Sequence, residues 1–176
     1  MSNVASAFIA RSRYHLSADF LPKIERCLEV LDDEQVWWRA NDQSNSIGNL
    51  ILHLCGNARQ WIVCGLGDAT DARDRAAEFA QREIIRRSEL HSLLRITMRD
   101  VDKTLGAFAP DSLMEGRIIQ GTETSGLEAI LHVVEHFSMH TGQIVLLTKI
   151  LAKKDLAFYD FSTGKPIPYV AAVPSE

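Results

Sequence analysis

The chain has 176 residues and a formal net charge of −4, with 46% hydrophobic and 24% charged residues. This length and composition suit a single globular domain over residues 1–176. The negative balance argues against a nucleic-acid partner, and the sequence has no run of about 18 apolar residues that could span a membrane. Three cysteines, together with an N-terminus that lacks a secretory pattern, favour a cytoplasmic protein with reduced thiols.

A first helix is predicted over about residues 4–31, because apolar residues recur at helical spacing from Phe8 to Leu31. Pro22 interrupts this pattern and should kink or restart the helix. Trp37 and Trp38 follow in a polar connection. Such a pair usually covers an edge of the core and less often forms a pocket wall.

A second helix is predicted over about residues 47–66, after an N-cap at Asn45-Ser46. His53 lies on the flank of its apolar stripe, where a lone histidine is more often a hydrogen-bonded core residue than a ligand. Asn57, one turn later, could hold a ligand ring or a metal-bound water.

Residues 68–75 form a charged loop that is long enough for a crossover connection in a bundle. A third helix is predicted over about residues 76–105. His91 lies on its apolar line and could be either a core histidine or part of a site. The opposite, basic face of this helix is typical of a solvated surface.

A fourth helix is predicted over about residues 126–153, because Ser125 and Glu128 form a capping box before a long apolar pattern. His132, His136 and His140 follow one another at four-residue intervals. His136 and His140 fall on the stripe that should face the core.

Two buried imidazoles on one helix face need a physical reason, because burying an unpaired polar ring costs about 1–3 kcal/mol. A shared metal ion would remove this cost, since side chains four residues apart are close enough to converge. His132 and His140 are about 12 Å apart along the axis, so the pair is either His136/His140 or His132/His136, and the stripe favours the former. The alternative is a set of structural histidines that only form hydrogen bonds.

Four long amphipathic helices without a convincing strand predict an all-α fold, a four-helix bundle. The connector lengths allow simple up-down order or one crossover. The tail, residues 155–176, carries aromatic residues and prolines, and we expect it to pack back on the bundle or on a second subunit. The aromatic residues and prolines on which this expectation rests are Phe158, Tyr159, Phe161, Pro166, Pro168 and Pro174.

Two stretches resemble the DinB-like family. Residues 45–54 (NSIGNLILHL), with Gly56, Asn57 and Trp61, resemble its second helix, and residues 135–144 (EHFSMHTGQI) resemble its late, histidine-bearing helix. The resemblance covers roughly residues 8–156. It implies an up-down-down-up bundle with a crossover, a homodimer, and a divalent metal held by His53, His136 and His140.

Three neutral imidazoles would leave coordination positions open, as in catalytic metal sites, and would accept Zn, Ni, Fe or Mn. The DinB-like proteins that these stretches resemble include thiol-dependent transferases and isomerases. The leading hypothesis is therefore a metal-dependent enzyme, a transferase, isomerase or hydrolase, that activates a low-molecular-weight thiol or water toward a small-molecule substrate. Asn57, Glu135 and Gln143 are the candidates for supporting ligands or handling protons.

Two other hypotheses remain. One is a metal-binding stress-related or interaction protein without turnover, in which protein side chains would fill the site. The other is a metal-free bundle whose histidines only form hydrogen bonds.

Overall fold

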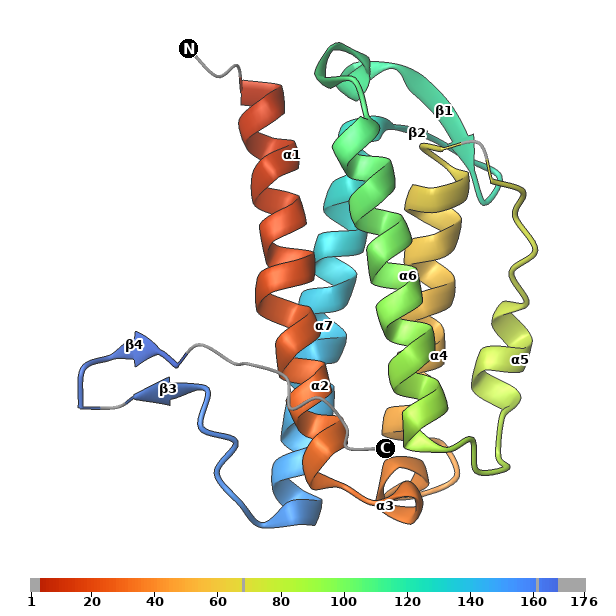
Figure 1. Cartoon of the computed structure of the whole chain (residues 1–176). Helices are drawn as coiled ribbons and strands as arrows, with labels where there is room; N and C mark the ends of the chain where they lie inside the picture. The colour runs from red at the N-terminus through yellow and green to blue at the C-terminus, as the bar shows by residue number, and fades with distance from the viewer. Residues whose placement is uncertain (1–3, 68, 161, 168–176) are drawn as a thin grey trace.

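Four long helical segments run side by side through the molecule (Figure 1). The computed structural model describes residues 4–67, 69–160 and 162–167. The first segment joins α1 (Val4–Tyr14), the π-helical turn η1 (His15–Phe20) and α2 (Leu21–Val30); the second joins α4 (Ile47–Ala58) and the π-helical turn η2 (Arg59–Cys64). The third is α6 (Arg87–Ala107) and the fourth is α7 (Gly126–Ala152). The predicted all-α bundle is confirmed.

The second and third segments run in the same direction, opposite to the first and the last (Figure 1). A crossover, defined here as residues 69–86, therefore returns the chain from the end of the second segment to the start of α6. It contains the short helix α5 (Arg75–Ala80) and lies along the outer side of α4. This is the up-down-down-up order with one crossover.

The single third helix predicted over residues 76–105 is wrong. The structure has α5, then non-helical backbone over residues 81–86, then α6. Tertiary hydrogen bonds stabilise the non-helical backbone of this segment. The Asn49 amide donates to the carbonyl of Gln81 (3.1 Å), and the Trp37 indole N–H donates to the carbonyl of Ile85 (2.8 Å). These contacts outweigh the helical periodicity of the sequence.

The irregularity predicted at Pro22 takes the form of the π-helical turn η1, which directly precedes α2. Pro22 is near the start of α2, so the helix continues past it without a break. The connection that follows is not plain coil, because a capping box at Asp32 starts a short helix, α3 (Asp33–Trp37). Trp37 packs so closely on α4 that a Cβ added at Gly48 would lie 2.7 Å from its ring.

Among the described residues, one β-hairpin precedes α7 in the chain and a second, shorter one follows it. The strands β1 (Gly116–Ile119) and β2 (Thr122–Ser125) pair antiparallel between α6 and α7. Their turn places Gln120 and Gly121 at positive φ, which is typical of a tight hairpin. The short strands β3 (Tyr159–Asp160) and β4 (Lys165–Pro166) pair after α7.

The tail packs back over only part of its described length. Leu156 is buried and Phe158 packs partly against the core. The β3–β4 hairpin projects away from the helices (Figure 1), because its strands and its turn, organised by Asp160, satisfy their polar groups locally. Phe161, Pro168 and Pro174 lie outside the described residues.

One hydrophobic core joins all four segments, with fully buried side chains such as Leu16, Leu54, Met98 and Phe137. Among the described residues, the helices lack the combination of length and apolar character that crossing a bilayer requires.

Candidate metal centre

Three histidines meet where α4 packs against α7. Nε2 of His136 lies 3.0 Å from Nε2 of His53 and 3.0 Å from Nε2 of His140. One ligand nitrogen from each ring falls within 4.8 Å of the other two. The structure therefore brings together His53, His136 and His140 from sites 83 residues apart in the chain.

Each ring is held by the packing of its helix. His53 and His140 are 5% and 8% exposed, and His136 is partly buried. His136 and His140 are one turn apart on α7, so both rings point toward α4. The rings of His53 and His140 each stand edge-on to that of His136, at centroid distances of 4.7 and 4.5 Å.

The far nitrogen of His53 is bound by a residue that the sequence did not suggest. Nδ1 lies 2.8 Å from Oε2 of Glu78, which comes from α5 in the crossover. Arg73 donates to both oxygens of that carboxylate, at 2.7 and 2.9 Å. Although burial opposes it, hydrogen bonds from Arg73 and His53 keep the pKa of Glu78 below its ordinary value. Nη2 of Arg73 also lies 3.1 Å from Nδ1 of His53, but it already donates to Oε2 of Glu78. We therefore assign the Nδ1 proton to the shorter contact, with the ionised carboxylate, which only accepts; Nε2 then keeps a lone pair facing the other histidines.

The far nitrogen of His140 is bound in a similar way. Its Nδ1 lies 2.7 Å from the side-chain oxygen of Gln143, one of the residues singled out in the sequence. An amide oxygen accepts, so Nε2 of His140 also presents a lone pair to the cluster. Gln143 thus orients a histidine of the cluster without belonging to it.

His136 stands at the centre of the cluster. Burial, with the neighbouring His140 and His53, lowers the pKa of His136 to about 3, so its ring is neutral at physiological pH. Its Nδ1 has no hydrogen-bond partner among the described residues. Burial also lowers the pKa of His140, and Gln143 opposes part of that change.

The cluster fits a divalent cation. Without one, Nε2 of His136 can donate its proton to only one neighbour, which leaves the Nε2 lone pair of the other neighbour without a donor at 3.0 Å. A cation about 2.1 Å from each nitrogen would accept all three lone pairs, and nitrogens 3.0 Å apart would subtend roughly 90° at it. Three such ligands leave further coordination positions for water or a substrate atom.

The other histidines have different partners. Nε2 of His132 bonds the side-chain amide of Asn57 at 3.0 Å, and its ring stacks on His136 and against Trp61. Asn57 therefore bonds His132, beside the cluster, and forms no hydrogen bond with the three clustered histidines in the part of the chain that the structure describes. Burial lowers the pKa of His132, and the exposed carboxylate of Glu135 opposes part of this shift.

His91 lies outside the cluster, because its Nε2 bonds Glu25 of α2 at 3.1 Å. It is a satisfied histidine at the contact between α2 and α6, the first of the two roles considered for it.

Sequence reasoning missed Glu78 and Arg73, which it assigned to the third helix and to the loop before it. One signal was present in Gly56, three residues after His53. A Cβ at this position would lie 1.9 Å from Oε1 of Glu78, so only glycine leaves room for the carboxylate.

The comparisons with known proteins agree with this architecture. Residues 3–165 match the family described as a protein of unknown function, DUF1572. A crystal structure of a DinB-like protein from Bacillus cereus ATCC 10987 superposes with a TM-score of 0.62 at 15% identity, covering 82% of this chain and 90% of that one. No protein with a curated description matches the chain. The resemblance found in the two histidine-bearing stretches is confirmed: the chain belongs to the DUF1572 family, and its fold is DinB-like.

Proposed function

We propose that the chain is a divalent-metal-dependent enzyme whose ion is held by His53, His136 and His140. The observation that carries this proposal is the convergence of three Nε2 atoms, with 3.0 Å between His136 and each of its two neighbours. Two of these rings are held by acceptors on their far nitrogens, the arrangement by which proteins orient metal-binding histidines.

A divalent ion bound by three imidazoles supplies Lewis acidity and lowers the pKa of a bound water or thiol. Zn, Ni, Fe and Mn are all compatible with imidazole ligands. The substrate that we propose is a small molecule, with a low-molecular-weight thiol or water as the attacking group.

The surrounding residues have separate roles in this proposal. Glu78 and Gln143 keep the ligand nitrogens unprotonated and aimed inward. Asn57 holds His132 against His136, and Glu135 lies exposed beside His132, where it could accept a proton from an incoming thiol or water.

The proposed homodimer has support in a stripe along α7. Leu131, Met139, Leu146 and Ile150 are between 39% and 60% exposed. At helical spacing these four side chains fall on one face, and exposed apolar stripes commonly mark protein contacts.

The first test is metal analysis of protein purified without a histidine tag, beside the His136→Ala/His140→Ala double variant. We expect about one divalent ion per chain in the parent protein and none in the variant. Absence of metal from the parent, even after incubation with Zn, Ni and Mn, would overturn the proposal.

A second test separates the enzyme from a non-catalytic metal-binding protein. The metal-loaded protein is screened with small thiols and electrophiles, and with hydrolysable esters and amides. Turnover that the double variant lacks supports the enzyme. A tightly bound ion with no turnover and no exchangeable water would favour the non-catalytic alternative.

A further inference from the structure

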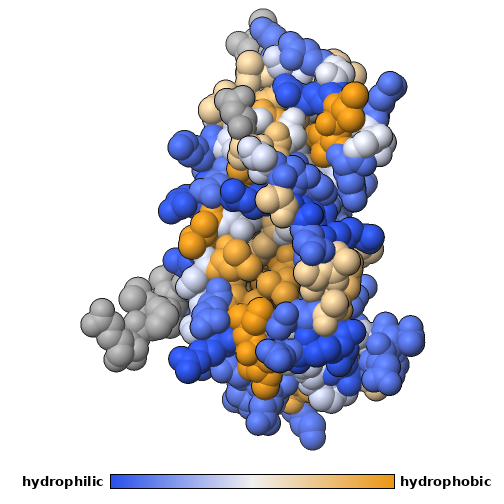
Figure 2. Space-filling view, turned by 90° about the vertical axis from the view of Figure 1, so that its right-hand side faces the viewer, coloured by the Kyte–Doolittle hydropathy of each residue, from blue (hydrophilic) through white to orange (hydrophobic). Residues whose placement is uncertain are grey.

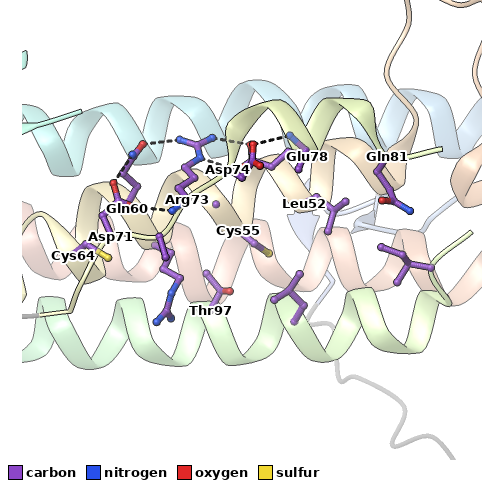
Figure 3. A pocket seen from close by; sticks show the side chains of 16 residues that line it. Leu52, Cys55, Gln60, Cys64, Asp71, Arg73, Asp74, Glu78, Gln81 and Thr97 are labelled. Atoms are coloured by element: carbon purple, nitrogen blue, oxygen red, sulfur yellow. Dashed lines mark hydrogen bonds and ion pairs between the residues drawn. The ribbon is translucent and has the colours of Figure 1, made fainter. Parts of the chain in front are cut away.

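A pocket lies beside α4 and the crossover, and two of its lining residues, Arg73 and Glu78, also contact His53 of the histidine cluster. The pocket has a volume of about 410 Å³ and is lined by Leu52, Cys55 and Gly56 of α4, by Thr97 of α6, and by Arg73 and Glu78 of the crossover (Figure 3). Hydrophobic surface gathers in the middle of the face that carries α5, framed by hydrophilic side chains (Figure 2). Arg73 and Glu78 thus stand between a solvent-facing pocket and His53.

A series of polar contacts docks the crossover onto η2, the continuation of α4. Arg73 donates to Gln60 at 2.9 Å, and Gln60 donates to Asp71 at 2.7 Å, so that Gln60, Arg73 and Glu78 form a continuous row (Figure 3). The side chain of Arg73 is only 4% exposed. An arginine buried to this degree depends on its partners, so the row holds together only while the crossover is in place.

The crossover is also fitted to α4 around Glu78 itself. The Asn49 amide donates to the carbonyl of Glu78 at 2.9 Å, and the Glu78 carboxylate fills the space left by Gly56. The next residue, Phe79, packs on the ring of His53 at a centroid distance of 4.5 Å. Two consecutive residues of the crossover therefore touch His53, one on its Nδ1 and one on its face.

We propose that Glu78 is a positioning residue for His53, so that docking of the crossover and binding of a divalent cation stabilise each other. The inference rests on the proposed metal site and deepens it. With the crossover docked, Glu78 accepts the Nδ1 proton and fixes the tautomer whose Nε2 can bind metal. With the crossover displaced, His53 loses both its acceptor and the ring that packs on it.

Coupling of this kind is reciprocal. If docking strengthens cation binding by some factor, a bound cation must strengthen docking by the same factor. Protection of the crossover from cleavage therefore reports metal binding, without any assay of activity.

The first experiment compares Zn²⁺ affinity, by chelator competition, in the parent protein and in Glu78→Ala, Glu78→Gln and Glu83→Gln. Glu78→Ala should weaken binding tenfold to about a hundredfold, the usual loss for a group that supports a metal-binding histidine. Glu78→Gln should retain part of the affinity, because its amide oxygen can still accept from Nδ1. Glu83 is an exposed residue of the same crossover, and Glu83→Gln should bind like the parent.

Gly56→Ala provides a variant that leaves the histidines and Glu78 unchanged. Its methyl group would displace the carboxylate, so it should weaken Zn²⁺ binding by a factor close to that of Glu78→Ala. When Gly56→Ala is added to Glu78→Ala, little further loss is expected, because the carboxylate that it displaces is already gone. Losses that multiply in the double variant would overturn the inference, as would Glu78→Ala with parental affinity. Circular dichroism confirms that each variant is folded.

The reciprocal experiment measures trypsin cleavage after Arg75 and Arg82, two exposed residues of the crossover. Zn²⁺ should slow this cleavage in the parent and have little effect in Glu78→Ala. Equal protection in both proteins would contradict the coupling while leaving the metal site intact. If the parent binds no Zn²⁺ at all, the proposed function and this inference fail together.

Discussion

Two places in the bundle hold a buried glutamate between an arginine and a histidine. In the first, Glu78 accepts from Arg73 and lies against His53. In the second, Glu25 of α2, only 3% exposed, accepts from Arg95 of α6 and lies against His91. The two trios have the same composition and the same kind of contacts.

The difference lies at the far side of each histidine. Nε2 of His53 meets Nε2 of His136 at 3.0 Å, with His140 beside it, whereas His91 uses its Nε2 on Glu25 and belongs to no ligand cluster among the described residues. A histidine paired with a buried carboxylate is therefore not by itself a sign of a metal site. A candidate metal site is indicated when the other ring nitrogen of that histidine also converges with nitrogens of further histidines, as Nε2 of His53 does.

The largest expected effect comes from removing His136, the central histidine of the proposed metal site. His136→Ala should lower Zn²⁺ affinity by about a thousandfold or more, beyond the tenfold to hundredfold loss typical of groups that act through a ligand. His91→Ala should leave the affinity unchanged, because it belongs to the other trio. Chelator competition measures both, and equal losses would erase the distinction between the two trios.

The second trio should matter for stability alone. Replacing His91 and Arg95 together by alanine leaves the Glu25 carboxylate buried without these partners. We expect the free energy of unfolding to fall by about 3 kcal/mol at neutral pH, since an uncompensated buried charge is costly. Urea denaturation measures the change, and Zn²⁺ affinity should stay at the parental value. A change below about 1 kcal/mol would contradict this assignment.

A smaller effect is expected at Gln143, which supports His140 from the exposed side of α7. Gln143→Ala should weaken Zn²⁺ binding about tenfold, because Nδ1 of His140 loses its acceptor. Gln143→Glu keeps an acceptor and serves as the matched variant. If both substitutions cost the same, the hydrogen bond has no part in binding.

The last prediction concerns the pH dependence of the metal-free protein, in which no cation affinity is measured. The pKa of His136 falls from its ordinary value near 6.5 to about 3 in the folded chain, so the unfolded chain binds more protons between these values. Stability from this group is complete above about pH 6.5 and is lost as the pH falls toward about 3. Urea midpoints at pH 7, 5 and 4 should decrease in that order, and less steeply in His136→Phe.

The sequence predicted the site best where the pattern is local. The four-residue spacing on a core-facing stripe indicated that His136 and His140 point inward, and they do. From its position alone, His53 was more often a core histidine than a ligand; the family resemblance is what grouped it with His136 and His140. Glu78 was missed, because it reaches His53 from a segment whose position depends on tertiary contacts at Asn49 and Gly56; Gly56 alone indicates a close approach without naming the partner.

The fold was also predictable from local patterns, and its prediction was wrong in the same segment, the crossover. Amphipathic periodicity located the four long segments, but it also ran through residues 81–86, where the structure has no helix. Hydrogen bonds from Asn49 and Trp37 decide the backbone there, and neither donor is near that segment in the sequence.

The separation of the proposed ligands along the chain has a kinetic consequence for metal binding. His53 and His136 are 83 residues apart, so an unfolded chain would have to close a long loop before both could bind one ion. An ion that binds mainly to the finished helix pair stabilises the native state more than the folding transition state. Metal should therefore slow unfolding and leave the folding rate nearly unchanged, so that its main benefit is a longer lifetime of the folded protein.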